Sequence, residues 1–175
     1  MKKLTTYSIA IMGLLIALTI VMTRLFSVET TFLRVSLGFV PQVMMGILFG
    51  PLWSGIGGVL ADFIGITLLG KAPFFIGFTI SAFVEGSIYG WFLYKKNITW
   101  QRTIVCVLVV FLVSRLFLTP LWLGLMYHVP FFSWIIWGQR LLSAAISFPI
   151  QVAVTYLVAK SVPYKRLLRT ANLFK

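Results

Sequence analysis

Acidic residues are almost absent from this 175-residue chain, which has three Asp and Glu against fifteen Lys and Arg. Charged residues of both signs make up only 10% of the chain, whereas hydrophobic residues make up 60%. The mean hydropathy of +1.02 is too high for a water-soluble domain of this length. The scarcity of charge therefore predicts an integral membrane protein with no room for a separate soluble catalytic domain.

Cysteine and the common catalytic motifs are also scarce or absent. Cys106 is the single cysteine, so it cannot form an intrachain disulfide, and no metal-ligand spacing surrounds it. The chain has no GxxxxGK[ST] phosphate loop, no HExxH zinc motif, no GxSxG nucleophile motif and no paired-aspartate cluster. We therefore predict that the protein is not an enzyme, hydrolyses no ATP and holds no metal.

Apolar runs divide the chain into six predicted transmembrane helices joined by short loops. Their expected limits are Tyr7–Phe26, Leu37–Phe49, Leu52–Leu69, Pro73–Tyr94, Thr103–Met126 and Phe132–Lys160. The second is short, and Gly50-Pro51 ends it because proline cannot continue a helix. The first begins like a signal peptide, but without a convincing cleavage site we expect a retained span. The fold class is an all-α membrane protein, with one membrane domain over residues 1–175.

The net charge of +12 comes from basic residues that flank the apolar runs. They cluster near the N-terminus, between the fourth and fifth runs, and after the sixth run. Because the number of spans is even, both termini lie on one side, and the positive-inside rule places that side in the cytoplasm. We expect a basic cytoplasmic tail at about residues 161–175 on the anionic inner leaflet. This distribution does not indicate a nucleic-acid partner.

Charged residues inside the apolar runs are the strongest sign of a binding site. Glu85 falls near the middle of the fourth run and Asp62 well inside the third, where an ionised carboxylate is costly unless it faces a cavity or a partner. Arg115 and Arg140 lie inside the fifth and sixth runs and need a carboxylate, a carbonyl or a bound anion. Since basic groups outnumber deep acids, we expect an anionic ligand. The alternative is that Glu85–Arg115 or Asp62–Arg140 are ion pairs that lock the bundle.

Helical spacing groups some of these residues with rings and hydroxyls. Glu85 shares a predicted face with Ser81 and Phe78, at spacings of four and seven. Arg115 precedes Thr119 and Trp122 by one and two turns. Most of the aromatic rings in the later runs are expected in the core or facing lipid, with a minority at a ligand.

Small residues form two further predicted surfaces. Gly13 and Ala17 lie one turn apart on the first run, where they would allow close approach of another helix or another protein. The third run carries a groove that we expect to be internal. Its members are Ser54, Gly58, Ala61 and Gly65.

Taken together, the six short-looped spans, the small first-helix face and the missing ATPase motif resemble the substrate-binding (S) components of energy-coupling factor (ECF) vitamin transporters. Three segments are similar to the folate-specific members: LRVSLGFVPQVMMGILFGP (Leu33–Pro51), FFIGFTISAFVEGSIYG (Phe74–Gly90) and QRLLSAAISFPIQ (Gln139–Gln151). The most specific part is the Arg-x-Ser-x-Gly-Phe-x-Pro run at Arg34–Pro41.

The resemblance implies a high-affinity folate-binding subunit in the bacterial plasma membrane. It would capture folate outside the cell and dock to a transmembrane coupling protein driven by two cytoplasmic ATPases. Folate would be the ligand, and no cofactor is expected. Gly13 and Ala17 would contact the coupling protein, with glycine at a position where alanine is usual. The residues expected at the ligand are Arg34, Ser36, Asp62, Lys71, Phe78, Glu85, Arg115, Trp122, Trp137 and Arg140.

The chemistry of folate matches these side-chain types. Its flat pterin ring would stack on one of the aromatic rings, and its amino-pyrimidine edge would pair with Glu85 or Asp62. Its dianionic glutamate tail would be held by Arg34, Lys71 or Arg140. The sequence does not assign an arginine to either end of the ligand.

Three other functions remain open from the sequence. The protein could be an S component for another flat or anionic vitamin, such as riboflavin or a queuosine precursor. It could be a small membrane enzyme that uses Arg115 and Arg140 to clamp lipid phosphates, although no nucleophile or metal cluster is visible. It could also be a structural or assembly subunit, which would bind no ligand and tolerate Glu85→Ala.

Overall fold

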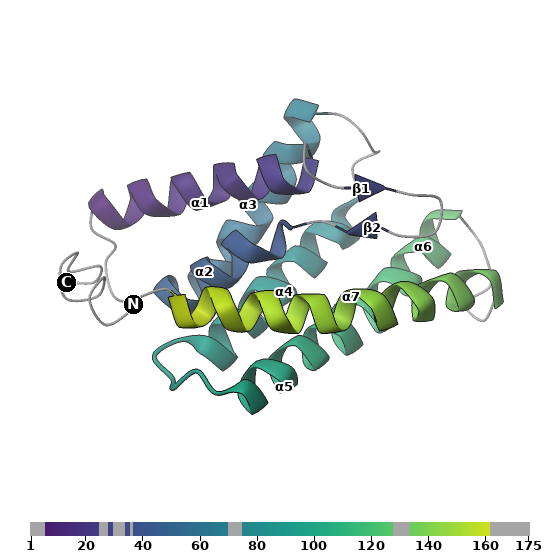
Figure 1. The fold of residues 1–175 in the computed structure, drawn as a ribbon. Helices are drawn as coiled ribbons and strands as arrows, with labels where there is room; N and C mark the ends of the chain where they lie inside the picture. Colours follow the sequence, from purple (N-terminus) through teal and green to yellow (C-terminus); the bar gives the residue numbers. More distant parts are fainter. Residues whose placement is uncertain are drawn as a thin grey trace.

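The six apolar runs fold into a bundle of helical rods in the computed structural model (Figure 1). The structure describes residues 6–24, 28–29, 34–35, 37–69, 75–127 and 134–161. The rods of this part are α1 (Thr6–Arg24), α2 (Phe39–Phe49), α3 (Pro51–Leu69), α4 (Ile76–Leu93), the continuous α5 (Trp100–Val110), η1 (Phe111–Leu118) and α6 (Thr119–Tyr127), and α7 (Trp134–Ser161). The predicted six-helix fold is confirmed, with every helix end within three residues of its expected position.

Two very short strands accompany the helices. β1 (Val28–Glu29) and β2 (Arg34–Val35) pair antiparallel, with Glu29 opposite Arg34. They lie toward the end of the bundle where α1 ends and α7 begins (Figure 1). Two-residue strands are too short for an alternating pattern, so the sequence does not reveal them.

Helix length and composition agree with a membrane location. Four helical stretches of the described residues are long and apolar enough to cross a bilayer: Thr6–Thr23, Pro51–Leu68, Ile76–Leu93 and Trp100–Trp122. α2 is apolar but has only 11 residues. At 1.5 Å per residue it is about 16 Å long, roughly half of a 30 Å hydrocarbon core.

A single residue, Gly50, separates α2 from α3. Its φ of +83° lies in the region that only glycine adopts readily, and its backbone N–H donates to the Gly46 carbonyl at the end of α2. Pro51 then begins α3, where its missing N–H costs no helical hydrogen bond. The sharp end predicted at Gly50-Pro51 is confirmed.

The small-residue groove of α3 lies against α4, as expected of an internal surface. Ser54 is fully buried, and Ala61 is buried as well. A Cβ on Gly58 would lie 2.7 Å from the Ala82 carbonyl oxygen, and one on Gly86 would lie 2.5 Å from the Ser54 carbonyl oxygen. These contacts are with backbone atoms, so α3 and α4 are held at a distance that larger side chains would not allow.

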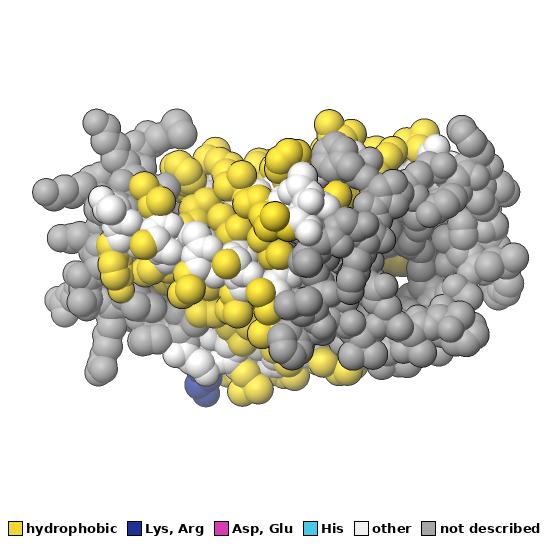
Figure 2. All heavy atoms as spheres, turned by 90° about the horizontal axis from the view of Figure 1, so that it is seen from above, with side chains coloured by type: hydrophobic (Ala, Val, Ile, Leu, Met, Phe, Trp, Pro, Cys, Tyr) yellow, Lys and Arg dark blue, Asp and Glu magenta, His cyan; other side chains and the backbone are white. Residues whose placement is uncertain are grey.

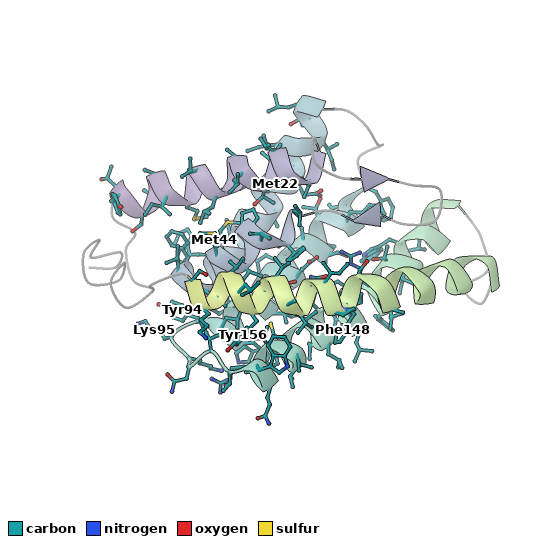
Figure 3. The ribbon with its side chains drawn as sticks, in the orientation of Figure 1. Met22, Met44, Tyr94, Lys95, Phe148 and Tyr156 are labelled. Carbon is teal, nitrogen blue, oxygen red and sulfur yellow. The ribbon has the colours of Figure 1, made fainter. Side chains whose placement is uncertain are left out.

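The core runs between α1, α2, α3, α4, α5 and α7. Its fully buried side chains include Val43, Met45, Ile47, Tyr89, Leu93, Cys106, Val110 and Ala159. A smaller cluster joins α5 and η1 to α7, where the rings of Phe111 and Phe148 meet edge to face with centroids 5.6 Å apart (Figure 3). Cys106 therefore packs in the core, as its position in an apolar run indicates.

The start of α1 and the end of α7 lie at the same end of the bundle (Figure 1). Tyr94 and Lys95, between α4 and α5, lie at this end too (Figure 3). The described ends of α1 and α7 and the connection between α4 and α5 therefore share one end of the bundle, while the placement of the two termini and of that side in the cytoplasm stays a prediction. On the side of α1, hydrophobic side chains cover most of the described surface (Figure 2), as a lipid-facing protein requires.

Candidate functional site

An aromatic cluster forms where the start of α4 meets α6. Phe75 directly precedes α4, Phe78 lies in its first turn, and Trp122 comes from α6. The ring centroid of Phe75 is 5.9 Å from that of Phe78 and 5.9 Å from that of Trp122. Gly77 makes this possible, because a Cβ there would overlap both the Trp122 ring and the Phe75 ring. The cluster offers aromatic surface on which a flat ligand can stack.

A hydrogen bond fixes the orientation of the tryptophan. The indole Nε1–H of Trp122 donates to Ser81 Oγ over 3.0 Å. The Ser81 hydroxyl in turn donates to the Gly77 carbonyl over 3.1 Å. Since the tryptophan has a single donor and it is used here, the ring is held in one rotamer by α4.

An acidic side chain lies on α3 next to the same helix. Thr79 Oγ1 donates to Asp62 Oδ2 over 3.0 Å, and both side chains are partly buried. A hydroxyl donor stabilises the charged carboxylate in a half-buried position. Asp62 could also accept hydrogen bonds from the amino-pyrimidine edge of a ligand. Among the described residues, no three of His, Cys, Asp and Glu gather where they could share a metal ion.

A second acidic side chain lies one turn further along α4, within electrostatic reach of a cation on η1. Glu85 lies four residues after Ser81, and the positive charge of Arg115 on η1 acts on its carboxylate. The Arg115 guanidinium also lies over the Phe111 ring, 5.4 Å from its centroid. Glu85 and Arg115 are therefore within electrostatic reach of each other, and for this pair both alternatives, an ion pair and a ligand site, stay predictions.

A second buried polar contact continues this layer toward α7. Gln151 Nε2 donates to Tyr89 Oη over 2.6 Å, and both side chains are buried. One face of α4 is therefore polar, since it carries Ser81, Glu85 and Tyr89 at spacings of four.

The structure brings together part of the predicted site. Phe78 and Trp122 join the aromatic cluster, Asp62 contacts α4 through Thr79, and Glu85 lies near Arg115. None of these contacts by itself shows which of these residues binds a ligand.

The side chains of the other predicted site residues lie outside the described part of the chain. Ser36 and Lys71 lie outside the described residues. Arg34 belongs to β2 and Trp137 and Arg140 to α7, but their side chains also lie outside the described part. Their roles at a ligand stay predictions.

Sequence reasoning missed several residues of this region. Gly77, Thr79 and the Tyr89–Gln151 pair were not singled out, although Gln151 had a usable signal as an uncharged polar residue within an apolar run. Nothing in the pattern distinguishes Gly77 from the other glycines of the chain.

The expected spacing along the fifth run is wrong in one respect. Phe111–Leu118 forms a π-helix, in which hydrogen bonds join residues five apart. Thr119 Oγ1 accordingly donates to the Ser114 carbonyl, so Thr119 and Trp122 do not follow Arg115 at regular α-helical turns. The available signal was Pro120, which cannot donate a backbone N–H and crowds the preceding turn of an α-helix.

The small-residue face of α1 is open. Gly13 and Ala17 are exposed, and a Cβ on Gly13 would meet no atom within 4 Å. Leu14, beside them, is 70% exposed. The described part of the chain therefore leaves this face uncovered, whereas the opposite side of α1 packs through Met12, Leu15 and Ile16.

Comparisons with known proteins agree with this architecture. The family model of the ECF transporter substrate-specific component matches residues 7–159. A folate transporter FolT of Clostridium novyi (strain NT) is 37% identical over 145 residues, covering 83% of each chain. One of Leuconostoc mesenteroides is 36% identical over 161 residues, covering 89% of this chain and 86% of the relative.

A solved structure is similar in both fold and sequence. It is a crystal structure of FolT bound with folic acid, with a TM-score of 0.85 and 49% identity, covering 89% of this chain and 94% of that one. The model match extends over most of the chain, and the relatives exceed 30% identity over most of their length. The chain belongs to the family of substrate-specific components of ECF transporters.

Proposed function

We propose that this chain is the folate-binding S component of an ECF-type importer in a bacterial plasma membrane. The observation that carries the proposal is its 49% identity, over nearly the whole fold, to a protein solved with folic acid bound. The two relatives named as folate transporters support the same vitamin. The role is that of a non-catalytic binding subunit that captures folate outside the cell.

The aromatic cluster and its acidic neighbours suit the pterin end of folate. Trp122 is held by Ser81 with its ring against Phe75, so it offers a stacking surface that needs little reordering on binding. Asp62 on α3 is bonded to Thr79 of α4, Glu85 belongs to α4 itself, and a carboxylate can accept two hydrogen bonds from an amino-pyrimidine edge. We assign the pterin to this region.

The glutamate tail of folate needs cations. Arg115 is a cation of the described part of the chain, and its charge already acts on the carboxyl group of Glu85. We therefore assign the tail to the predicted cations Arg34, Lys71 and Arg140, which lie beyond the described side chains. A guanidinium binds a carboxylate through two parallel hydrogen bonds, which makes the arginines the stronger candidates.

Folate titration of the purified protein in detergent tests this proposal. Tryptophan fluorescence should be quenched saturably, because Trp122 lies in the proposed site. The titration should give about one folate per chain and sub-micromolar affinity. Riboflavin and thiamine serve as control vitamins. Quenching by riboflavin but not by folate would identify riboflavin as the ligand. No response to folate in a folded protein would contradict the proposal.

We also propose that α1 docks onto a transmembrane coupling protein, which works with two cytoplasmic ATPases. The support is the open face of Gly13 and Ala17, which allows a second helix to approach closely. Changing both residues to Leu should leave folate affinity unchanged, because the new side chains enter open space, and should abolish folate uptake in cells. Val105→Leu, on an exposed position of α5, is the matched control and should leave uptake unchanged. Normal uptake by the double variant would exclude this face as the docking surface.

A further inference from the structure

The rod from Trp100 to Tyr127 changes its helical type in the middle. Its eight central residues, Phe111–Leu118, form the π-helix η1. Such segments are rare, are mostly single turns and frequently lie at functional sites. Pro120 follows almost at once, and its ring would crowd the carbonyl four residues earlier in a regular α-helix. The wider turn of η1 directly precedes the helix that contains this proline.

The π-helix changes the direction of the side chains beyond it. In an unbroken α-helix Arg115 and Trp122, seven residues apart, would lie on one face within about 20° of each other. One additional residue in a turn rotates everything after it by about 100°, the angle that one α-helical residue spans. Trp122 follows η1, so it is turned by about this angle relative to the residues before η1 and by part of it relative to Arg115, which lies within η1.

The two residues also have different contacts. Arg115 lies over the ring of Phe111, and this ring meets that of Phe148 on α7 edge to face. Trp122 donates to Ser81. The guanidinium is therefore held beside a ring that packs on α7, whereas the indole is bonded to α4.

We propose that η1 is a positioning element of the folate site, and that its additional residue is what presents Trp122 to Ser81 while Arg115 is held over the ring of Phe111. The inference rests on the proposed function and deepens it. A ligand that joins a flat ring to an anionic tail needs aromatic surface and charge at different places. A regular helix would direct both side chains along one line.

Deletion of one residue within η1 tests the proposal. Phe117 is suitable because it is 62% exposed, so its loss removes no core contact directly. The deletion should restore a regular α-helix and rotate Trp122 away from Ser81. In the ligand-free protein the wavelength of maximum Trp122 emission should shift. The Trp122 spectrum is obtained by subtracting the emission of the Trp122→Phe version of each chain. Folate affinity should fall roughly two- to tenfold, as expected when an oriented aromatic contact is lost.

Deletion of Leu125 is the matched control. This residue is also exposed, at 59%, and lies in α6 beyond Trp122, so its loss shortens the helix without rotating the tryptophan. Trp122 emission and folate affinity should both stay at the parent values. Equal effects of the two deletions, or no effect of deleting Phe117, would overturn the proposal.

A substitution keeps the test decisive where the Phe117 deletion does not fold. Pro120→Ala removes the ring that would crowd a regular α-helix without shortening the chain, and it should shift Trp122 emission in the same direction as the deletion. Unchanged emission would overturn the proposal. Because the emission is measured without folate, a parent chain that fails to bind folate would contradict the proposed function and would leave this measurement interpretable.

Discussion

The buried hydrogen bond between Tyr89 and Gln151 gives the sharpest stability prediction. Its two side chains join α4 to α7 in the interior of the bundle, at a donor–acceptor distance of 2.6 Å. Tyr89→Phe removes the acceptor and leaves the Gln151 amide without this partner. Gln151→Leu removes the donor and leaves the Tyr89 hydroxyl without it. Each single change therefore leaves one polar group buried in apolar surroundings.

The size of the effect follows from the cost of burying a polar group without a partner. That cost is about 1–3 kcal/mol, whereas replacing both partners with apolar groups of similar shape can be nearly neutral. Each single variant should therefore lose about 1–3 kcal/mol, and the double variant should lose less than their sum. The coupling should lie near the upper end of values measured between transmembrane helices, roughly 1–2 kcal/mol.

Thermal unfolding of the purified protein in detergent measures these differences. For a chain of this length, 1 kcal/mol corresponds to roughly 2–4 °C in the midpoint, so each single variant should melt roughly 2–12 °C lower. The matched control is Tyr156→Phe, at a ring that contacts Trp100 near the end of α7 (Figure 3). Additive losses in the double variant would refute the reasoning, since they would mean that the two groups do not depend on each other.

Two further predictions follow from the same helices. Glu85→Gln should weaken folate binding by roughly tenfold or more, because hydrogen bonds to a charged group contribute about 1.5–3 kcal/mol. The midpoint of thermal unfolding shows whether the variant still folds. Unchanged folate affinity would remove Glu85 from the site. Gly90→Ala should lower the free energy of unfolding by about 1–3 kcal/mol, because its Cβ would overlap the backbone at Pro51. The control Gly13→Ala places its Cβ in open space and should be neutral or slightly stabilising. Equal effects of the two changes in thermal unfolding would contradict the packing argument.

The arrangement of spans was predictable because apolar runs of membrane length have few alternative structures. The end of α2 was predictable for a local reason, since Gly50-Pro51 ends a helix whatever surrounds it. The internal groove of α3 was predictable from its small residues. What these features share is that each depends on residues close together in the sequence.

The candidate site was only partly predictable because it depends on contacts between helices. The face of Glu85, Ser81 and Phe78 was correct, since regular α-helical spacing holds along α4. The relation between Arg115 and Trp122 was not, because η1 breaks that spacing. The partner of each residue depends on the rotation and depth of a neighbouring helix, and helical periodicity does not specify either.

The shortness of α2 has a consequence for how charge enters the bundle. Along its axis the helix accounts for about 16 Å, so about half of a 30 Å hydrocarbon layer has no helix from this segment. Non-helical backbone at such depth must be buried in protein or hydrated. Where this depth is hydrated, the low-dielectric barrier beside α2 is thinner than a full hydrocarbon layer. An ionised group that approaches from this end loses hydration over a shorter path, and its desolvation cost is reduced accordingly.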